Sequence, residues 1–336
     1  MFRALFIAGL MMLAGCSQPQ ETPPGDVEID ADLLKDFQPS PEVMENPKNP
    51  ITEAKVKLGR MLYYEPRLSA AGDLSCNSCH PLDAYGVDHL PVSTGHKGRK
   101  GTRNAPTTYH AAAQVVQFWD GRAADVEEQA KGPILNPVEM AMPDARAVET
   151  ILSGKPEYVT AFRQAFPKEK EPVTFDNAAL AIAAFERKLV TRGRWDRFLE
   201  GDANALSPEE KAGFIAFHKA GCIACHNGPH LGGKFYIKVG MARPWTNQAD
   251  LGRYLVTKQE HHKMVFKVPV LRNVDKTGPY LHDGSMAGLE ETVRLMGELQ
   301  IEKPLTDSEV RRITAWLKSL TGELPAAYIA RPRLPE

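Results

Sequence analysis

The sequence has no excess of charge of either sign and, beyond its first residues, no apolar run of membrane-spanning length. It carries 41 Lys and Arg against 42 Asp and Glu in 336 residues. No general attraction to nucleic acid or to anionic lipid is therefore expected. A bilayer span needs roughly 20 consecutive apolar residues, and the apolar run near the start of the chain, Ala4 to Leu13, is too short to provide one.

Cysteine is scarce, and four of the five cysteines fall into two copies of one pattern. Cys76-Asn-Ser-Cys79-His80 and Cys222-Ile-Ala-Cys225-His226 both match Cys-x-x-Cys-His, the attachment signature of c-type haem. Two thiols at this spacing can form thioethers with one porphyrin, and the adjacent histidine can then ligate the iron. A four-ligand zinc site would need both pairs in one place, whereas they lie far apart in the sequence. We therefore predict two covalently bound c-type haems.

The fifth cysteine, Cys16, follows a segment that resembles a signal peptide. Arg3 precedes the apolar run, and Leu13-Ala-Gly-Cys16 looks like a bacterial lipobox. Residues 1–15 are predicted to be cleaved and Cys16 to be lipidated, with an ordinary secretory signal as the alternative. Both readings predict export to the periplasm, and the first adds a lipid tether to a membrane. Residues 16–49 are rich in proline and acid and are expected to form the tether.

Apolar periodicity and capping signals predict a mostly α fold with long loops and little strand. Helices are expected over 55–63 and 208–219, each just before a haem motif, and a third from Asp176. Ser207 with Glu210 and Thr306 with Glu309 read as capping boxes. We therefore expect two cytochrome c-like haem domains, residues 50–189 and 190–322, followed by a tail over 323–336.

Catalysis requires one iron whose sixth position can open. His96 lies in a Gly-rich, basic segment over 93–101 that is unsuited to a stable helix, so it could bind an iron and release it. His89 and His110 compete for this role in the first half. The second half offers a thioether ligand among Met241, Met264, Met286 and Met296. A thioether ligand raises a haem's potential relative to a second histidine.

Several motifs in order closely resemble the bacterial dihaem cytochrome c peroxidases, over roughly residues 40 to 325. They are Gln117-Phe-Trp-Asp-Gly-Arg122, Gln129-Ala-Lys-Gly-Pro133, Val138-Glu-Met140, Phe266-Lys-Val-Pro269, Leu271-Arg-Asn273 and His282-Asp-Gly284. The resemblance implies that the haem on Cys76, Cys79 and His80 is the low-potential peroxidatic site, with His96 as its removable ligand. It implies that the haem on Cys222, Cys225 and His226 transfers electrons, with Met296 as its axial ligand.

The same resemblance assigns roles to residues around the two haems. Trp119 matches a tryptophan between them, and Asn104, Thr277 and Pro279 match a calcium site, whose oxygen-only ligands suit a hard cation. Glu139 is expected to move a proton between the two peroxide oxygens, which is general acid–base catalysis, while Gln129 orients the peroxide. Reduction of the second haem is expected to free the His96 loop and open the first site.

The expected substrate is hydrogen peroxide, with a small reduced cytochrome c or a cupredoxin as electron donor and no role for nucleic acid. A homodimer is implied by the resemblance alone. One alternative function is a dihaem electron carrier without catalysis, in which both irons stay six-coordinate. The other is a dihaem oxidase that modifies a partner protein. That relative has tyrosine in place of the axial methionine, so Met296 argues against it.

Overall fold

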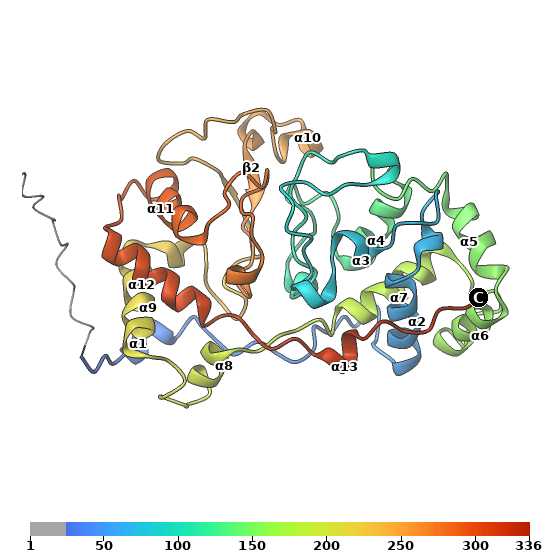
Figure 1. The fold of residues 1–336 in the computed structure, drawn as a ribbon, viewed down its shortest axis with the longest axis horizontal. Helices are drawn as coiled ribbons and strands as arrows, with labels where there is room; N and C mark the ends of the chain where they lie inside the picture. The colour runs from blue at the N-terminus through green and yellow to red at the C-terminus, as the bar shows by residue number, and fades with distance from the viewer. Residues whose placement is uncertain (1–24) are drawn as a thin grey trace, which may run out of the picture.

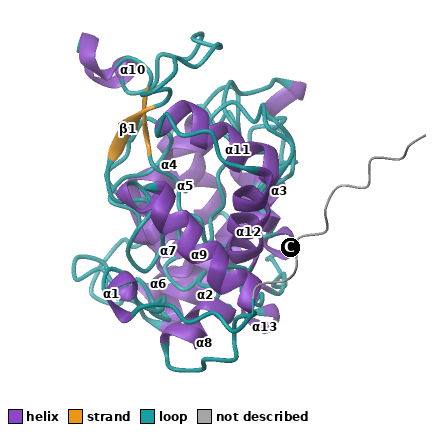
Figure 2. Cartoon of the chain, turned by 90° about the vertical axis from the view of Figure 1, so that its left-hand side faces the viewer, coloured by secondary structure: helices purple, strands orange, loops and turns teal. Residues whose placement is uncertain are grey.

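The computed structural model describes residues 25–336, so Cys16 and the predicted signal peptide lie outside the described residues. Figure 1 shows two lobes side by side, one formed by the first half of the chain and one by the second. Figure 2 shows helices and long loops with a single small pair of strands. The prediction of a mostly α fold is confirmed. Within residues 25–336, no helix is both long and apolar enough to cross a membrane.

The first lobe is built from α-helices that surround one hydrophobic core. They are α2 (Glu53–Tyr63), α3 (Cys76–Cys79), α4 (Val126–Leu135), α5 (Ala145–Ser153), α6 (Pro156–Ala165) and α7 (Phe175–Glu186). Short 3-10 turns connect them, namely η1 (Pro66–Leu68), η2 (Leu82–Ala84), η3 (His96–Gly98) and η4 (Ala111–Ala113). The core is centred on α2 and α7 and includes Leu58, Leu62, Phe162 and Ile182.

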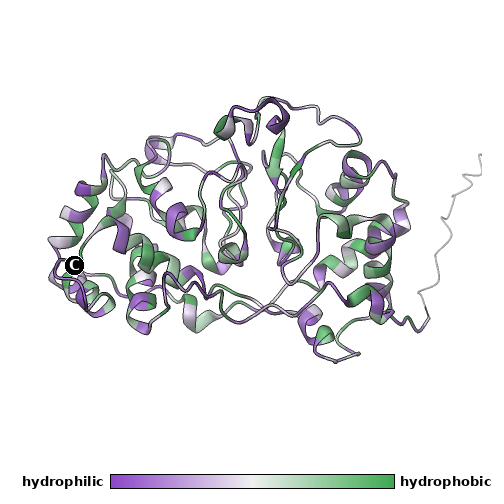
Figure 3. Ribbon diagram, turned by 180° about the vertical axis from the view of Figure 1, so that it is seen from behind, coloured by the Kyte–Doolittle hydropathy of each residue, from purple (hydrophilic) through white to green (hydrophobic). Residues whose placement is uncertain are grey.

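The second lobe has its own core, centred on α9 and α12. Its α-helices are α8 (Arg194–Leu199), α9 (Pro208–Ala220), α10 (Tyr254–Thr257), α11 (Leu289–Gln300) and α12 (Asp307–Lys318). Its 3-10 turns are η5 (Cys222–Ala224), η6 (Glu260–His262) and η7 (Val274–Lys276). Trp195, Phe214 and Trp316 pack edge-on or tilted at the centre of this core. In Figure 3 the helices of both lobes carry apolar and polar faces.

A glycine brings the two principal helices together in each lobe. A Cβ built on Gly59 in α2 would lie 1.9 Å from the Ala181 carbonyl oxygen in α7, and one on Gly213 in α9 would lie 1.9 Å from the Arg312 carbonyl oxygen in α12. Neither position has space for a side chain. The helix that precedes each haem motif is thus held in contact with a later helix of the same lobe.

Both predicted capping boxes are present. The Ser207 amide donates to Glu210 Oε2 at 2.8 Å and the Glu210 amide to Ser207 Oγ at 3.3 Å. Thr306 and Glu309 exchange equivalent bonds at the start of α12. The third predicted helix begins one residue before Asp176, because Thr174 caps it by accepting from the Asn177 amide.

The only sheet among residues 25–336 is one antiparallel pair of short strands. β1 (Tyr236–Lys238) pairs with β2 (Val265–Lys267), with Tyr236 opposite Lys267. The local strand signal over 264–268 corresponds to β2, whereas β1 was not anticipated. All three residues of β2 are buried, because the strand lies between the outer loops and the interface with the first lobe (Figure 1).

The terminal segments are packed against both lobes. Ile29 and Phe37, which flank α1 (Ala31–Leu34), belong to the second core, whereas the Met44 amide donates to the Arg187 carbonyl in the first lobe. The later part of the predicted tether over 16–49 is therefore packed against both lobes, and its Ile29 and Phe37 belong to the second core. Its earlier part, residues 16–24, lies outside the described residues.

The C-terminal tail crosses back from the second lobe to the first. It contains α13 (Ala326–Ile329), whose Ile329 carbonyl accepts from Tyr64 Oη at 2.5 Å. Tyr328 Oη donates to the Phe185 carbonyl at 2.8 Å, and Arg67 donates to the Pro335 carbonyl. Figure 1 shows this crossing at the lower side of the molecule, where the N-terminal segment also passes between the lobes.

Candidate functional site

The first Cys-x-x-Cys-His motif forms a single helical turn beside a cavity. Cys76 and Cys79 are the two ends of α3, both carry free thiols, and both line the cavity with His80. His80 Nδ1 lies 3.1 Å from the Gly86 carbonyl oxygen. This contact occupies Nδ1 and leaves Nε2 as the available ligand atom, an arrangement typical of metal-bound histidines.

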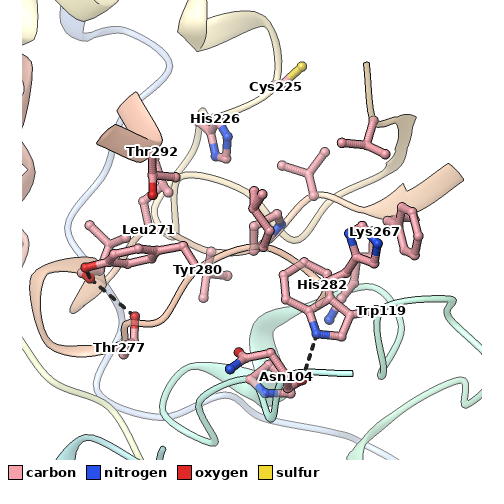
Figure 4. Close-up of a pocket in the computed structure, with 18 of the residues that line it drawn as sticks. Asn104, Trp119, Cys225, His226, Lys267, Leu271, Thr277, Tyr280, His282 and Thr292 are labelled. Carbon is pink, nitrogen blue, oxygen red and sulfur yellow. Dashed lines mark hydrogen bonds between the residues drawn. The ribbon is translucent and has the colours of Figure 1, made fainter. Parts of the chain in front are cut away.

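The second motif repeats this arrangement in the other lobe. Gly221, with a φ of +89°, ends α9 and turns the chain into η5, where Cys222 begins the second motif. His226 Nδ1 lies 3.0 Å from the Leu231 carbonyl oxygen, so its Nε2 is also left available. Cys225 and His226 line a second cavity, shown in Figure 4. Burial lowers the pKa of both His80 and His226, which favours the neutral imidazole that can bind a metal.

Both cavities fit a covalently attached haem. The two cavities are similar in size, about 1290 Å³ around the first motif and about 1270 Å³ around the second when their open mouths are counted. The walls are largely apolar, as a porphyrin requires. Cys76, Cys79 and His80 line the first cavity, and Cys225 and His226 line the second, with Cys222 three residues before Cys225 in the sequence.

The two cavities differ in their polar groups. Glu139, Gln129 and Arg122 line the first, whereas no carboxylate lines the second among residues 25–336. Glu139 Oε1 accepts from Asn136 Nδ2 at 2.8 Å. Burial raises the pKa of Glu139, and this effect outweighs the opposing influence of Arg122 and Asn136. A carboxylate with a raised pKa is a stronger base, which suits a group that accepts and returns a proton during a reaction.

His96 lies at the edge of the first cavity rather than on its wall. Its backbone amide donates to the carbonyl oxygens of Val138 and Glu139 at 3.0 and 2.8 Å. Gly95 and Ser93 line the cavity, but His96 does not, and its Nδ1 is buried without a hydrogen-bonding partner. The His96 turn is thus fixed by its main chain to the segment that carries Glu139.

The competing histidines occupy other surroundings. His89 is exposed, with Nδ1 3.0 Å from the Gly278 carbonyl oxygen. His110 is buried between Ser40 and Thr191 at the lobe interface, and neither histidine lines the first cavity.

Trp119 lies between the two cavities and lines both. Its Nε1 donates to the Asn104 carbonyl at 3.0 Å, and its own carbonyl accepts from the Lys267 amide at 2.8 Å. Trp119 is therefore held through its ring by the first lobe and through its main chain by the second.

The remaining predicted ligands gather around the second cavity. Met296 lines it together with His226, whereas Met241, Met264 and Met286 do not. Asn104, Thr277 and Pro279, the three predicted calcium ligands, line the same cavity. Asn104 donates through Nδ2 to the Leu90 and Pro91 carbonyls, and within residues 25–336 no hydrogen bond occupies its Oδ1.

Comparison with known proteins identifies the family. Residues 53–204 match the family model described as di-haem cytochrome c peroxidase. The cytochrome c551 peroxidase of Pseudomonas aeruginosa is 46% identical over 316 residues, covering 91% of this chain and 90% of that protein. The chain belongs to the dihaem cytochrome c peroxidase family. The family assignment made from the sequence motifs is thereby confirmed.

Two further relatives of this dihaem peroxidase family member agree with the assignment. The cytochrome c551 peroxidase of Nitrosomonas europaea is 46% identical over 271 residues, covering 80% of each chain. The crystal structure of a MauG-like protein associated with microbial copper homeostasis superposes with a TM-score of 0.79 at 28% identity, covering 91% of this chain and 99% of that one. Membership of the family supports two haems.

Two buried charged residues in the cavities were not identified from the sequence. Glu186, at the end of α7, lines the first cavity, and burial raises its pKa to about 8. Lys267 lines the second cavity and is 5% exposed. Lys267 lies inside one of the family motifs, but a single charged residue in a sequence does not reveal that it is buried.

Proposed function

We propose that this dihaem protein reduces hydrogen peroxide to water at the first haem, with electrons delivered through the second haem by a small reduced cytochrome c or a cupredoxin. The overall reaction consumes one peroxide, two electrons and two protons and yields two waters. The observation that carries the proposal is the asymmetry between the cavities. Among residues 25–336, carboxylates line the first cavity and not the second, Glu139 among them, and Trp119 lines both.

The haems supply electron transfer and peroxide cleavage when bound, held by the two cysteine pairs, His80, His226 and Met296. Glu139 takes the proton from the inner peroxide oxygen and returns it to the outer one, so that water can leave. Gln129 donates a hydrogen bond that orients the peroxide. Arg122 lines the same space and stabilises negative charge during the transfer.

We also propose that His96 gates the first site. His96 would hold the first iron in the oxidised protein and release it when the second haem is reduced. The attachment of its main chain to Val138 and Glu139 supports this proposal, because movement of the turn would change the acid's position as well. A calcium ion held by Asn104, Thr277 and Pro279 would couple the gate to the second lobe.

The proposed location is the periplasm, with a lipid on Cys16 as membrane tether and a homodimer as the assembly. The relatives' names as peroxidases support the proposed reaction. Mass spectrometry of the membrane fraction would test the lipid on Cys16.

The deciding experiment is peroxide turnover by the haem-replete, calcium-loaded protein with reduced cytochrome c as donor. First turnovers are compared between oxidised protein and protein whose second haem has been reduced beforehand. Turnover only after reduction is expected and supports both the peroxidase and the gate. Equal turnover in both states would support the peroxidase reaction and exclude gating by His96. No turnover, with both haems present, would favour the electron carrier or the partner-modifying oxidase.

A further inference from the structure

The second cavity contains a buried lysine, Lys267, with which no acidic side chain of residues 25–336 pairs. Lys267 is 5% exposed and its ammonium group lines a space otherwise walled by apolar and neutral polar side chains. Within residues 25–336, no Asp or Glu lines this cavity. Removing a charge from water without pairing it is unfavourable. We therefore expect an anion beside Lys267 when its ammonium group is charged.

Lys267 is held in place from the first lobe. Its Nζ donates to Gln114 Oε1, and its backbone amide donates to the Trp119 carbonyl. In β2 both Phe266 and Lys267 are buried, so the strand has no solvent-exposed face to which the lysine could turn. Figure 4 shows Lys267 on the same side of the cavity as Trp119 and His282, with Tyr280 and Thr277 on the other side.

Gln114 satisfies one of the three donors of the ammonium group but does not neutralise its charge. In the protein alone, burial lowers the pKa of Lys267 to about 7. A carboxylate brought within contact distance would hold the lysine in its charged form. The question is which carboxylate enters this cavity.

We propose that Lys267 pairs with a propionate of the haem attached at Cys222 and Cys225. The haem is tethered in the same cavity and carries two carboxylates, which makes it the anion that the fold itself brings to this place. Through Lys267, the propionate of the second haem would be connected to Gln114 and Trp119. Both residues belong to the first lobe, and Trp119 also lines the cavity of the first haem. The assignment rests on a haem at this site and not on peroxide turnover.

The test compares Lys267→Met with Lys238→Met, a matched control at an exposed lysine of β1. The reduction potential of each haem is measured by spectroelectrochemical titration, after haem content has been checked by mass and absorption. Loss of the cation should disfavour the ferrous state of the second haem by tenfold or more in its equilibrium constant, about 59 mV for one electron. The first haem and the control should be unchanged, and Lys267→Arg should restore most of the potential.

A second measurement uses the unmodified protein and holds even if Lys267→Met does not fold. A crystal structure of the haem-loaded protein should place Lys267 Nζ within salt-bridge distance, about 4 Å, of a propionate oxygen of the second haem. A larger separation from both propionates would overturn the assignment. So would an unchanged potential in a Lys267→Met protein that retains both haems. Neither the reduction potential nor the crystal structure depends on turnover. The Lys267 assignment can therefore be tested even if the protein does not reduce peroxide.

Discussion

At the scale of single residues, the two carboxylates of the first cavity are in different surroundings. Glu139 is bonded to Asn136 and attracted by Arg122. Within residues 25–336, no side chain donates a hydrogen bond to Glu186, whose pKa of about 8 keeps it protonated at neutral pH. Glu139 is therefore the better proton acceptor, although both acids face the same space.

Glu139→Gln should lower kcat for peroxide by about 10² to 10⁴, the usual contribution of a general acid–base group. Glutamine keeps the shape and the contact with Asn136 but cannot carry the proton. Stopped-flow turnover measures the effect, with the exposed Glu171→Gln as the control. Full activity in Glu139→Gln would exclude this residue from the reaction.

His96→Gly should make the oxidised protein active in its first turnovers without prior reduction of the second haem. Glycine removes the candidate ligand yet preserves the backbone amide that bonds to Val138 and Glu139. The absorption spectrum of the oxidised first haem should change to a five-coordinate or water-bound form. A variant that stays six-coordinate and inactive would show that another group blocks the iron.

At the scale of helices and strands, the sequence predicts what is locally encoded. The capping boxes at Ser207 and Thr306 were correct because cap and partner are three residues apart. Strand β1 was missed because its three residues become a strand only by pairing with β2, far along the chain. The packing of Phe37 was missed for the same reason, since its partners Trp195 and Phe214 are distant in sequence.

The residues of the functional site also differ in how far a local sequence pattern predicts them. The haem motifs follow from spacing alone, whereas Trp119, Glu139 and Gln129 were assigned through family resemblance. The burial of Glu186 and Lys267 depends on which helix or strand face is covered by the other lobe or by a cavity wall. No local pattern carries that information.

Gly59→Ala should destabilise the protein by about 1–3 kcal/mol, the usual cost of overpacking. The added methyl carbon would overlap the Ala181 carbonyl oxygen, so α2 and α7 would have to separate. Chemical denaturation followed by circular dichroism measures the change. Gly25→Ala is the control, because a Cβ there meets no atom within 4 Å. Equal stability of the two variants would mean that the helices can shift without cost.

At the scale of the whole molecule, a cluster of ion pairs formed by Arg103, Asp120 and Asp250 connects the two lobes. Arg103 of the first lobe binds Asp250 of the second through Nε and Nη2 at 2.6 and 2.8 Å, and Asp120 of its own lobe at 2.6 Å. Burial opposes ionisation of Asp250, but the hydrogen bonds from Arg103 and Gly252 lower its pKa below 3.8. Arg103 is close in sequence to the His96 turn, so this contact joins the proposed gate to the second lobe.

The Arg103–Asp250 pair should stabilise the protein above about pH 3.8 and lose its effect as the pH falls through the lower pKa of the folded state. Asp250→Asn should therefore have a lower Tm than the wild type at neutral pH, and the difference should shrink below pH 3.8. Thermal scans from pH 3 to 7, set by the usual carboxyl titration range, measure it. A difference independent of pH would assign the loss to packing instead of charge.

The crossing of both terminal segments determines the order in which the molecule can be completed during synthesis. The first lobe needs Tyr328 and Ile329, which follow the helices of the second lobe in the sequence. The second lobe needs Ile29 and Phe37, which are made long before the rest of it. Neither half is therefore a finished unit that could be cut out and expressed alone. The first lobe can therefore be closed only after the whole of the second lobe has been synthesised.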